Sequence, residues 1–142
     1  MPDRTTPLPR LGALERQVMD VLWSCADELC TRRVLERLTT TTLAYTTVAT
    51  VLTNLMRKGL VERVSTERAW SYRPRLERSE YVAGLMAQEL AASDDRPGTL
   101  RDLVRALGSD DRAALRDALR PGSRRSDPPV AAGSTRFAEC DA

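Results

Sequence analysis

The spacing of the apolar residues changes once along the first half of this chain, and that change limits the folds it can adopt. Before Gly59, apolar residues recur every three or four positions in three segments, which predicts amphipathic helices over residues 11–22, 31–38 and 45–58. Thr31 is the expected N-cap of the second helix, and Gly59 stands where glycine commonly ends a helix. The first half of the chain is therefore expected to begin with three helices.

After Gly59 the apolar residues alternate with polar ones over two short segments. Residues 60–64 are rich in apolar side chains, residues 65–69 are polar and turn-like, and Trp70 and Tyr72 alternate with polar residues until Pro74. This pattern predicts a two-stranded hairpin. Residues 24–30, between the first two predicted helices, are expected to be a connection without regular structure. Three helices followed by a hairpin are typical of a winged helix-turn-helix. We expect a mainly α-helical fold with this domain over residues 11–75.

Helical spacing returns over residues 76–120, in short segments that Pro97-Gly98 interrupts, with Thr99 as the expected cap after the break. Short amphipathic helices bury little apolar surface within one chain, so a second copy of the chain would cover them. Packing back onto the first domain is the alternative, but the apolar residues exceed what a small domain needs. We expect a helical dimerisation domain whose interface comprises Tyr81, Val82, Leu85, Met86, Leu100, Leu103, Val104, Leu107, Leu115 and Leu119.

The two ends of the chain are expected to be loose. Residues 1–10 include three prolines and resemble a flexible arm. Residues 121–142 are rich in Arg, Ser, Pro, Gly and Ala, which predicts a disordered tail. No run of about 18 apolar residues suggests membrane insertion, and no secretory signal is visible, so the cytoplasm is the expected compartment.

The composition excludes several classes of function. The chain has no histidine, which removes the commonest general base and the commonest metal ligand. It also has no glycine-rich phosphate loop and no paired carboxylates in an apolar setting, so we expect neither an enzyme nor a cofactor. Three cysteines without a CxxC motif do not form the pattern of a disulfide framework, and no metal site is expected. Cys25 and Cys30 are either a redox pair or two small, partly buried residues, and we favour the second interpretation.

The solvent face of the third helix has an unusual composition. Eight threonines lie between positions 39 and 53, although threonine is a poor helix former. A threonine hydroxyl can reach a phosphate or a base edge, its methyl group can pack on thymine, and an asparagine can pair with adenine. A threonine-rich surface without a partner is the alternative, but we favour double-stranded DNA. The predicted contacts on this helix are Thr46, Thr47, Thr50, Thr53, Asn54, Arg57 and Lys58.

Basic residues support the same interpretation. Residues 1–75 carry 12 Lys and Arg against 8 Asp and Glu, whereas residues 76–142 carry 10 against 12. Arg63 and Arg68 of the hairpin are candidates for contact with the DNA backbone or minor groove, and Arg32, beside Arg33, could hold a phosphate. Solvated arginines that bind nothing are the alternative at each position. A second class of function, an adaptor that binds a protein, would require an aromatic or apolar face rather than a polar one.

Three segments together resemble the penicillinase-repressor family of transcription factors. They are LGALERQVMDVLW, AYTTVATVLTNLMRKGLVER and ERAWSYRPRLERSEYVAGLM, within residues 10–90. The resemblance implies a winged-helix homodimer that represses genes from palindromic operators, of the β-lactamase or cell-envelope and antibiotic-response type. It also implies that Thr46, Thr47, Thr50 and Asn54 read DNA, although family members often carry arginine in place of Asn54.

Two features depart from the family pattern. Copper-responsive members carry a cysteine-rich C-terminal metal motif, whereas here only Cys140 lies near the end. Antibiotic-responsive members act with a membrane-bound sensor protease and are cleaved at an Asn-Phe bond. In this chain Asn54 precedes Leu55 and Phe137 follows Arg136, so that bond is absent. A sensor protease stays an expected partner, with cleavage elsewhere or another route of derepression.

Overall fold

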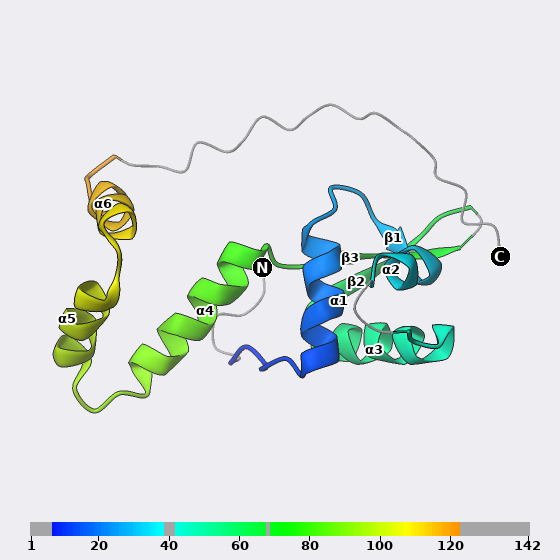
Figure 1. Cartoon of the computed structure of the whole chain (residues 1–142), viewed down its shortest axis with the longest axis horizontal. Helices are drawn as coiled ribbons and strands as arrows, with labels where there is room; N and C mark the ends of the chain where they lie inside the picture. Colours follow the sequence, from blue (N-terminus) through cyan, green and yellow to red (C-terminus); the bar gives the residue numbers. More distant parts are fainter. Residues whose placement is uncertain (1–6, 39–41, 68, 123–142) are drawn as a thin grey trace. The chain divides into compact units, whose positions relative to one another are not determined.

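The computed structural model describes residues 7–38, 42–67 and 69–122. These residues form two compact units, of which the first ends at Leu85 and the second begins at Met86. Figure 1 labels the elements, which are α1 (Ala13–Trp23), β1 (Leu29–Cys30), α2 (Thr31–Arg37), α3 (Tyr45–Arg57), β2 (Val61–Ser65), β3 (Trp70–Pro74), α4 (Arg78–Ala91), α5 (Arg96–Ala106) and α6 (Ser109–Ala118). The boundary between the units therefore lies inside α4.

The first unit packs three helices and a small sheet around one apolar core. The apolar stripes predicted from the sequence enter it, and Val18, Val34, Val48, Leu52 and Leu55 are fully buried. Each buried side chain of this size stabilises the fold by about 1.5–3 kcal/mol through loss of contact with water. This core fixes which side of α3 faces outward.

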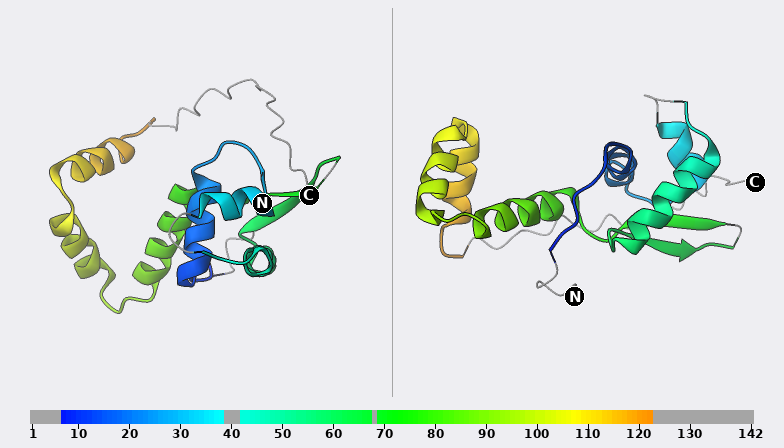
Figure 2. Two further views of the ribbon diagram at one scale, coloured as in Figure 1. Left: turned by 45° about the vertical axis from the view of Figure 1, so that its right-hand side comes forward. Right: turned by 90° about the horizontal axis from the view of Figure 1, so that it is seen from below.

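The sheet has three antiparallel strands in the order β1-β3-β2, not the two strands expected. Residues 29 and 30, predicted as part of a connection, pair with Tyr72 and Ser71 of β3. A strand of two residues is too short to show alternation, so the sequence pattern could not reveal it. Figure 2 shows the β2–β3 hairpin projecting from the three helices, as expected for a wing.

The predicted N-cap of α2 is wrong, whereas the predicted end of α3 is confirmed. Thr31 is the first residue of α2 and is buried, while Cys30 holds the extended N-cap conformation, so the predicted threonine cap is wrong. Gly59 has a φ of +76°, and the N–H groups of Gly59 and Leu60 donate to the carbonyls of Met56 and Leu55. This arrangement is a Schellman motif, and it ends α3 where the sequence predicted.

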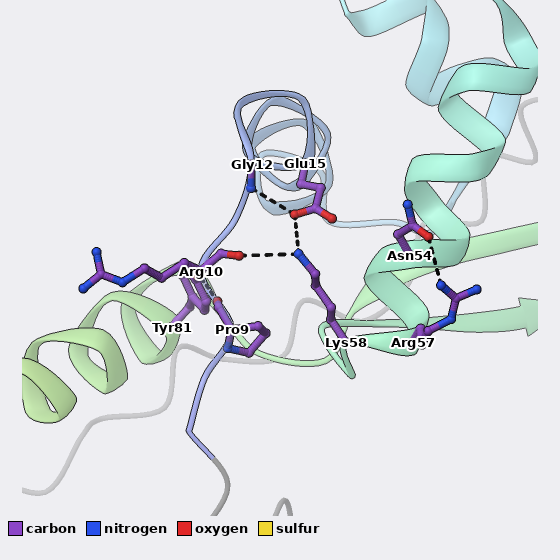
Figure 3. Close-up of polar contacts among 8 residues, drawn as sticks. All are labelled: Pro9, Arg10, Gly12, Glu15, Asn54, Arg57, Lys58 and Tyr81. Carbon is purple, nitrogen blue, oxygen red and sulfur yellow. Dashed lines mark hydrogen bonds and ion pairs between the residues drawn. The ribbon is translucent and has the colours of Figure 1, made fainter.

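Residues 7–10, expected to belong to a flexible arm, are an extended segment packed on the first unit. Leu8 packs against the core, and the Pro9 carbonyl accepts a 2.7 Å hydrogen bond from the Tyr81 hydroxyl (Figure 3). Tyr81 is 1% exposed, and its ring lies 5.6 Å from that of Trp23. Tyr81 was predicted to contact a second copy of the chain, but it is a core residue of its own unit. The apolar spacing is the same in both cases and could not separate them.

The second unit contains the end of α4 together with α5 and α6. The N-cap of α5 is Asp95, whose carboxylate accepts from the Gly98 N–H, so Pro97 and Gly98 lie in the first turn. The Thr99 hydroxyl donates to the Asp95 carbonyl and caps nothing, which corrects the predicted start of this helix. Proline is favoured in a first helical turn because its missing N–H is not needed there. Neither α5 nor α6 has a buried residue.

Candidate nucleic-acid interface

The predicted polar face of α3 lies outward, opposite its buried stripe. Thr46, Thr50 and Thr53 are exposed, and Thr47 and Asn54 are half-buried. Arg57 is exposed in the last turn of the helix. Except for Arg57, these side chains carry no charge, which is unusual for a helix face that contacts only water. The face is therefore available to a partner that can hydrogen-bond with hydroxyl and amide groups.

Two of the hydroxyl groups on this face are already oriented by hydrogen bonds to the helix backbone. Thr50 donates to the Thr46 carbonyl at 2.9 Å, and Thr53 donates to the Ala49 carbonyl at 3.0 Å. Each hydroxyl has one proton and two lone pairs, so these bonds leave the oxygens as acceptors. At these two positions the face offers hydrogen-bond acceptors and methyl groups rather than hydroxyl donors.

Asn54 and Arg57 contact each other on the same face. Nη1 of Arg57 donates to Oδ1 of Asn54 at 3.3 Å, as Figure 3 shows. This bond uses one lone pair of the amide oxygen and leaves the second lone pair and the amide N–H groups. The contact restrains both side chains before any ligand binds.

Lys58, predicted to contact a phosphate, forms an ion pair within the chain, and the phosphate contact itself stays a prediction. Its Nζ lies 2.7 Å from Oε2 of Glu15 and 3.5 Å from the Arg10 carbonyl (Figure 3). Glu15 also accepts from the Gly12 N–H at 3.0 Å. The hydrogen bond from Lys58 lowers the pKa of Glu15, while burial acts in the opposite direction. The ammonium group therefore joins the end of α3 to the start of α1, and its charge is compensated within the chain.

The hairpin places its two described arginines on opposite faces. The guanidinium of Arg63 lies 3.8 Å from the ring centroid of Trp70. Arg73 forms ion pairs with Glu62 and Glu28. The sequence pattern predicted Trp70 only as a strand residue. In the structure its half-exposed ring lies beside a candidate arginine. Arg68, the other predicted wing contact, lies outside the described residues.

The remaining predicted basic contact lies on α2. Arg32 is exposed in the first turn, whereas the neighbouring Arg33 pairs with Glu36 at 3.5 Å. Arg32 belongs to a helix of only seven residues, and its predicted phosphate contact stays a prediction.

The cysteines do not form a metal site in the described residues. Cys25 is a half-buried free thiol whose sulfur accepts from Arg37. In the ranges 7–38, 42–67 and 69–122, no three His, Cys, Asp or Glu side chains are grouped to hold a metal ion. Within those ranges, no helix combines the length and apolar character needed to span a membrane.

Most of the predicted dimer-interface residues keep apolar surface exposed. Leu85 packs against the core of the first unit and Leu107 is half-buried. The residues that expose large apolar side chains are Val82, Met86, Leu100, Leu103, Val104, Leu115 and Leu119.

Comparison with known proteins identifies the family. The penicillinase repressor family model matches residues 11–121. The transcriptional regulator BlaI of Mycobacterium tuberculosis, from strains CDC 1551 / Oshkosh and H37Rv, is 47% identical over 116 residues, which cover 79% of this chain and 84% of the relative. The chain belongs to the penicillinase repressor family. The expected family and winged-helix fold are confirmed, and the chain is a transcriptional regulator rather than an enzyme.

Two solved structures resemble part of this repressor-family chain. One is the solution structure of the Bacillus licheniformis BlaI monomer in complex with the blaP half-operator, at 29% identity and a TM-score of 0.45. The other is the solution structure of the DNA-binding domain of the repressor BlaI, at 29% identity and a TM-score of 0.46. Each alignment covers 52% of this chain and 90% of the other chain. Membership of the family rests on the sequence relationships.

Proposed function

We propose that this protein is a homodimeric repressor whose α3 helix reads a palindromic operator in the major groove. The observation that carries the proposal is the uncharged hydroxyl and amide face of α3, held outward by a fully buried opposite face. A 13-residue helix is about 20 Å long, enough to lie along the groove. From the family we further propose control of β-lactamase or cell-envelope genes, with a membrane-bound sensor protease as the partner that relays the signal.

The chemistry of the face favours reading of bases by threonine. With their protons donated to the helix backbone, the Thr50 and Thr53 oxygens can accept from the amino groups of adenine or cytosine. Their methyl groups can pack on the methyl group of thymine. The exposed Arg57 would contact a phosphate, which fixes position rather than sequence.

The second unit supports a dimer. Neither α5 nor α6 buries any residue, while Leu103 and Val104 leave 37% and 40% of their surface exposed. A second copy of the chain would cover these residues, because large apolar surfaces are costly to leave in water. A two-fold dimer would place two α3 helices on half-sites about 34 Å apart, one turn of DNA.

Base reading can be tested with two variants of Thr50 in the full-length chain, each of which removes one functional group of the side chain. Thr50→Val removes the acceptor and keeps the methyl group, whereas Thr50→Ser does the reverse. Each should weaken binding to a duplex from the protein's own promoter by about 1 kcal/mol per half-site, or fivefold. Thr99→Val is the matched control, since Thr99 is also an exposed helical threonine that donates to a backbone carbonyl. Fluorescence anisotropy at two salt concentrations would measure this, and equal affinities for all variants would contradict base reading.

The dimer can be tested by placing a charge on the exposed stripe of α5. Leu103→Glu should give a monomer in sedimentation velocity, which binds a palindromic duplex weakly but keeps its affinity for a half-site. Arg101→Glu also adds negative charge to α5, at an exposed position, and should stay dimeric. A dimeric Leu103→Glu protein would contradict this interface, and a monomeric wild-type protein would contradict the dimer itself.

A further inference from the structure

We propose that Trp70 is a positioning residue for DNA binding, because its indole ring holds the guanidinium of Arg63 for contact with a backbone phosphate. This inference rests on the proposed DNA binding and adds a residue that the sequence pattern assigned only to the strand. The proposed ligand at the exposed end of the hairpin is the phosphodiester backbone of duplex DNA.

The register of the hairpin places the two side chains on one face. Arg63 is paired with Tyr72, and Ser65 is paired with Trp70, so Arg63 and Trp70 are diagonal neighbours on the same side. Such neighbours are within reach of long and aromatic side chains. On this side Val61 and Tyr72 are buried in the core, whereas Arg63 and Trp70 lie farther along the strands and are exposed. The pair therefore extends the core-facing side of the hairpin beyond the core.

The charges of Arg63 and Arg73 differ in whether a carboxylate of the described residues compensates them. Within the part of the chain that the structure describes, Arg63 forms no ion pair, and its guanidinium rests 3.8 Å from the Trp70 ring centroid. Arg73, on the opposite face of the same hairpin, is paired with both Glu62 and Glu28. Of these two arginines, only Arg63 offers a positive charge to a polyanion without first breaking an ion pair.

The indole ring also restrains the arginine in a useful way. A stacked guanidinium covers the ring with its flat face, and the N–H donors at its edge stay available for a phosphate. A side chain that is already restrained loses less conformational entropy on binding. Trp70 itself is 49% exposed and is the first residue of β3, next to the hairpin turn, so the pair is accessible to a ligand.

The test compares variants of the full-length protein on the promoter duplex described above. Arg63→Ala and Arg73→Ala each remove one positive charge from the hairpin, which makes them a matched pair. Arg63→Ala should reduce the slope of log affinity against log salt by about 0.9 per half-site, whereas Arg73→Ala should leave the slope unchanged. Trp70→Ala should weaken binding about three- to fivefold per half-site, and Trp70→Phe should restore part of the loss.

The double variant decides whether Trp70 acts through Arg63. If it does, adding Trp70→Ala to Arg63→Ala causes no further loss of affinity. Additive losses, or equal effects of Arg63→Ala and Arg73→Ala, would overturn the inference while wild-type binding still supports the proposed function. A wild-type protein that binds no duplex would instead overturn both. Circular dichroism of each variant checks folding, and the two arginine variants keep the test decisive if Trp70→Ala does not fold.

Discussion

Replacing Tyr81 with phenylalanine isolates the hydrogen bond that ties the N-terminal segment to α4. The hydroxyl donates to the Pro9 carbonyl at 2.7 Å, and the ring is 1% exposed beside Trp23. Phenylalanine keeps the ring and its packing. The substitution therefore removes one buried hydrogen bond and leaves the Pro9 carbonyl without this donor. Such a loss destabilises a protein by about 1–2 kcal/mol.

Urea unfolding followed by circular dichroism measures this effect. With a urea dependence of about 1–2 kcal/mol per molar, the midpoint should fall by about 0.5–2 M at an unchanged slope. Tyr45→Phe is the matched control, because Tyr45 is 52% exposed and surface substitutions stay within about 0.5 kcal/mol. If the two variants unfold at the same urea concentration, the bond to Pro9 does not stabilise the protein, and the segment over residues 7–10 is not held by Tyr81.

The alkaline limb of stability gives an independent check on Tyr81. Burial raises the pKa of Tyr81 above its ordinary value of 10.0, because the phenolate would lose its hydration. A folded pKa above the unfolded one means that stability is fully present below pH 10 and falls as the pH rises through the folded value. Tyr81→Phe has no group to ionise, so its stability should decline less than that of the wild type above pH 10. An equal decline would contradict the burial of this phenol.

Three further perturbations test the contacts around the first unit. Glu15→Gln should lower the free energy of unfolding at pH 6 and leave it equal to that of the wild type in acid. The reason is that Lys58 lowers the pKa of Glu15 below 4.5, so the ion pair's contribution to stability is lost as the pH falls through the folded pKa. A constant difference across this pH range would contradict it. Gly84→Ala introduces a Cβ that overlaps Cδ1 of Leu8. The higher helix propensity of alanine should therefore raise the free energy of unfolding, by about 1 kcal/mol, only in a protein that also carries Leu8→Ala. An equal gain with Leu8 and with Ala at position 8 argues against the contact. Gly59→Ala should destabilise by about 1–2 kcal/mol in urea, since its φ is +76° and nothing else lies near; an unchanged midpoint refutes this.

The parts of the fold that the sequence predicted are those with a long periodic signal. The helix predicted over residues 45–58 corresponds to α3, Tyr45–Arg57. Its apolar spacing stops just before Gly59, so both signals place the end of the helix at the same point. Strand β1 has two residues and no period of its own, since it exists only through pairing with β3. At α5 the sequence showed Pro97-Gly98 as a break, but Asp95 accepts from Gly98 and begins the helix before the proline.

The sequence was sufficient to predict which face of α3 is exposed, but not which contacts its charged side chains make. Which side of α3 faces outward follows from the buried stripe, so the exposure of Thr50 and Thr53 could be predicted. Whether a charge is available depends on residues far away in sequence, and Lys58 is compensated by Glu15, 43 positions earlier. Among the described residues Arg63 has no such partner, whereas Arg73 pairs with Glu62, its cross-strand neighbour on the other face of the hairpin. No local pattern distinguishes these arginines.

One segment of the chain joins the end of α3 to the start of α4 within the first unit. The Pro9 carbonyl accepts from Tyr81 of α4, and the next carbonyl along the chain, that of Arg10, accepts from Lys58 at the end of α3. Glu15 then completes the connection by pairing with the same lysine. The ends of α3 and α4 therefore both hydrogen-bond to consecutive carbonyl groups of this segment, in addition to packing in the core. The residues predicted as a loose arm thus contribute, in their described part, to how firmly the proposed DNA-reading helix is held.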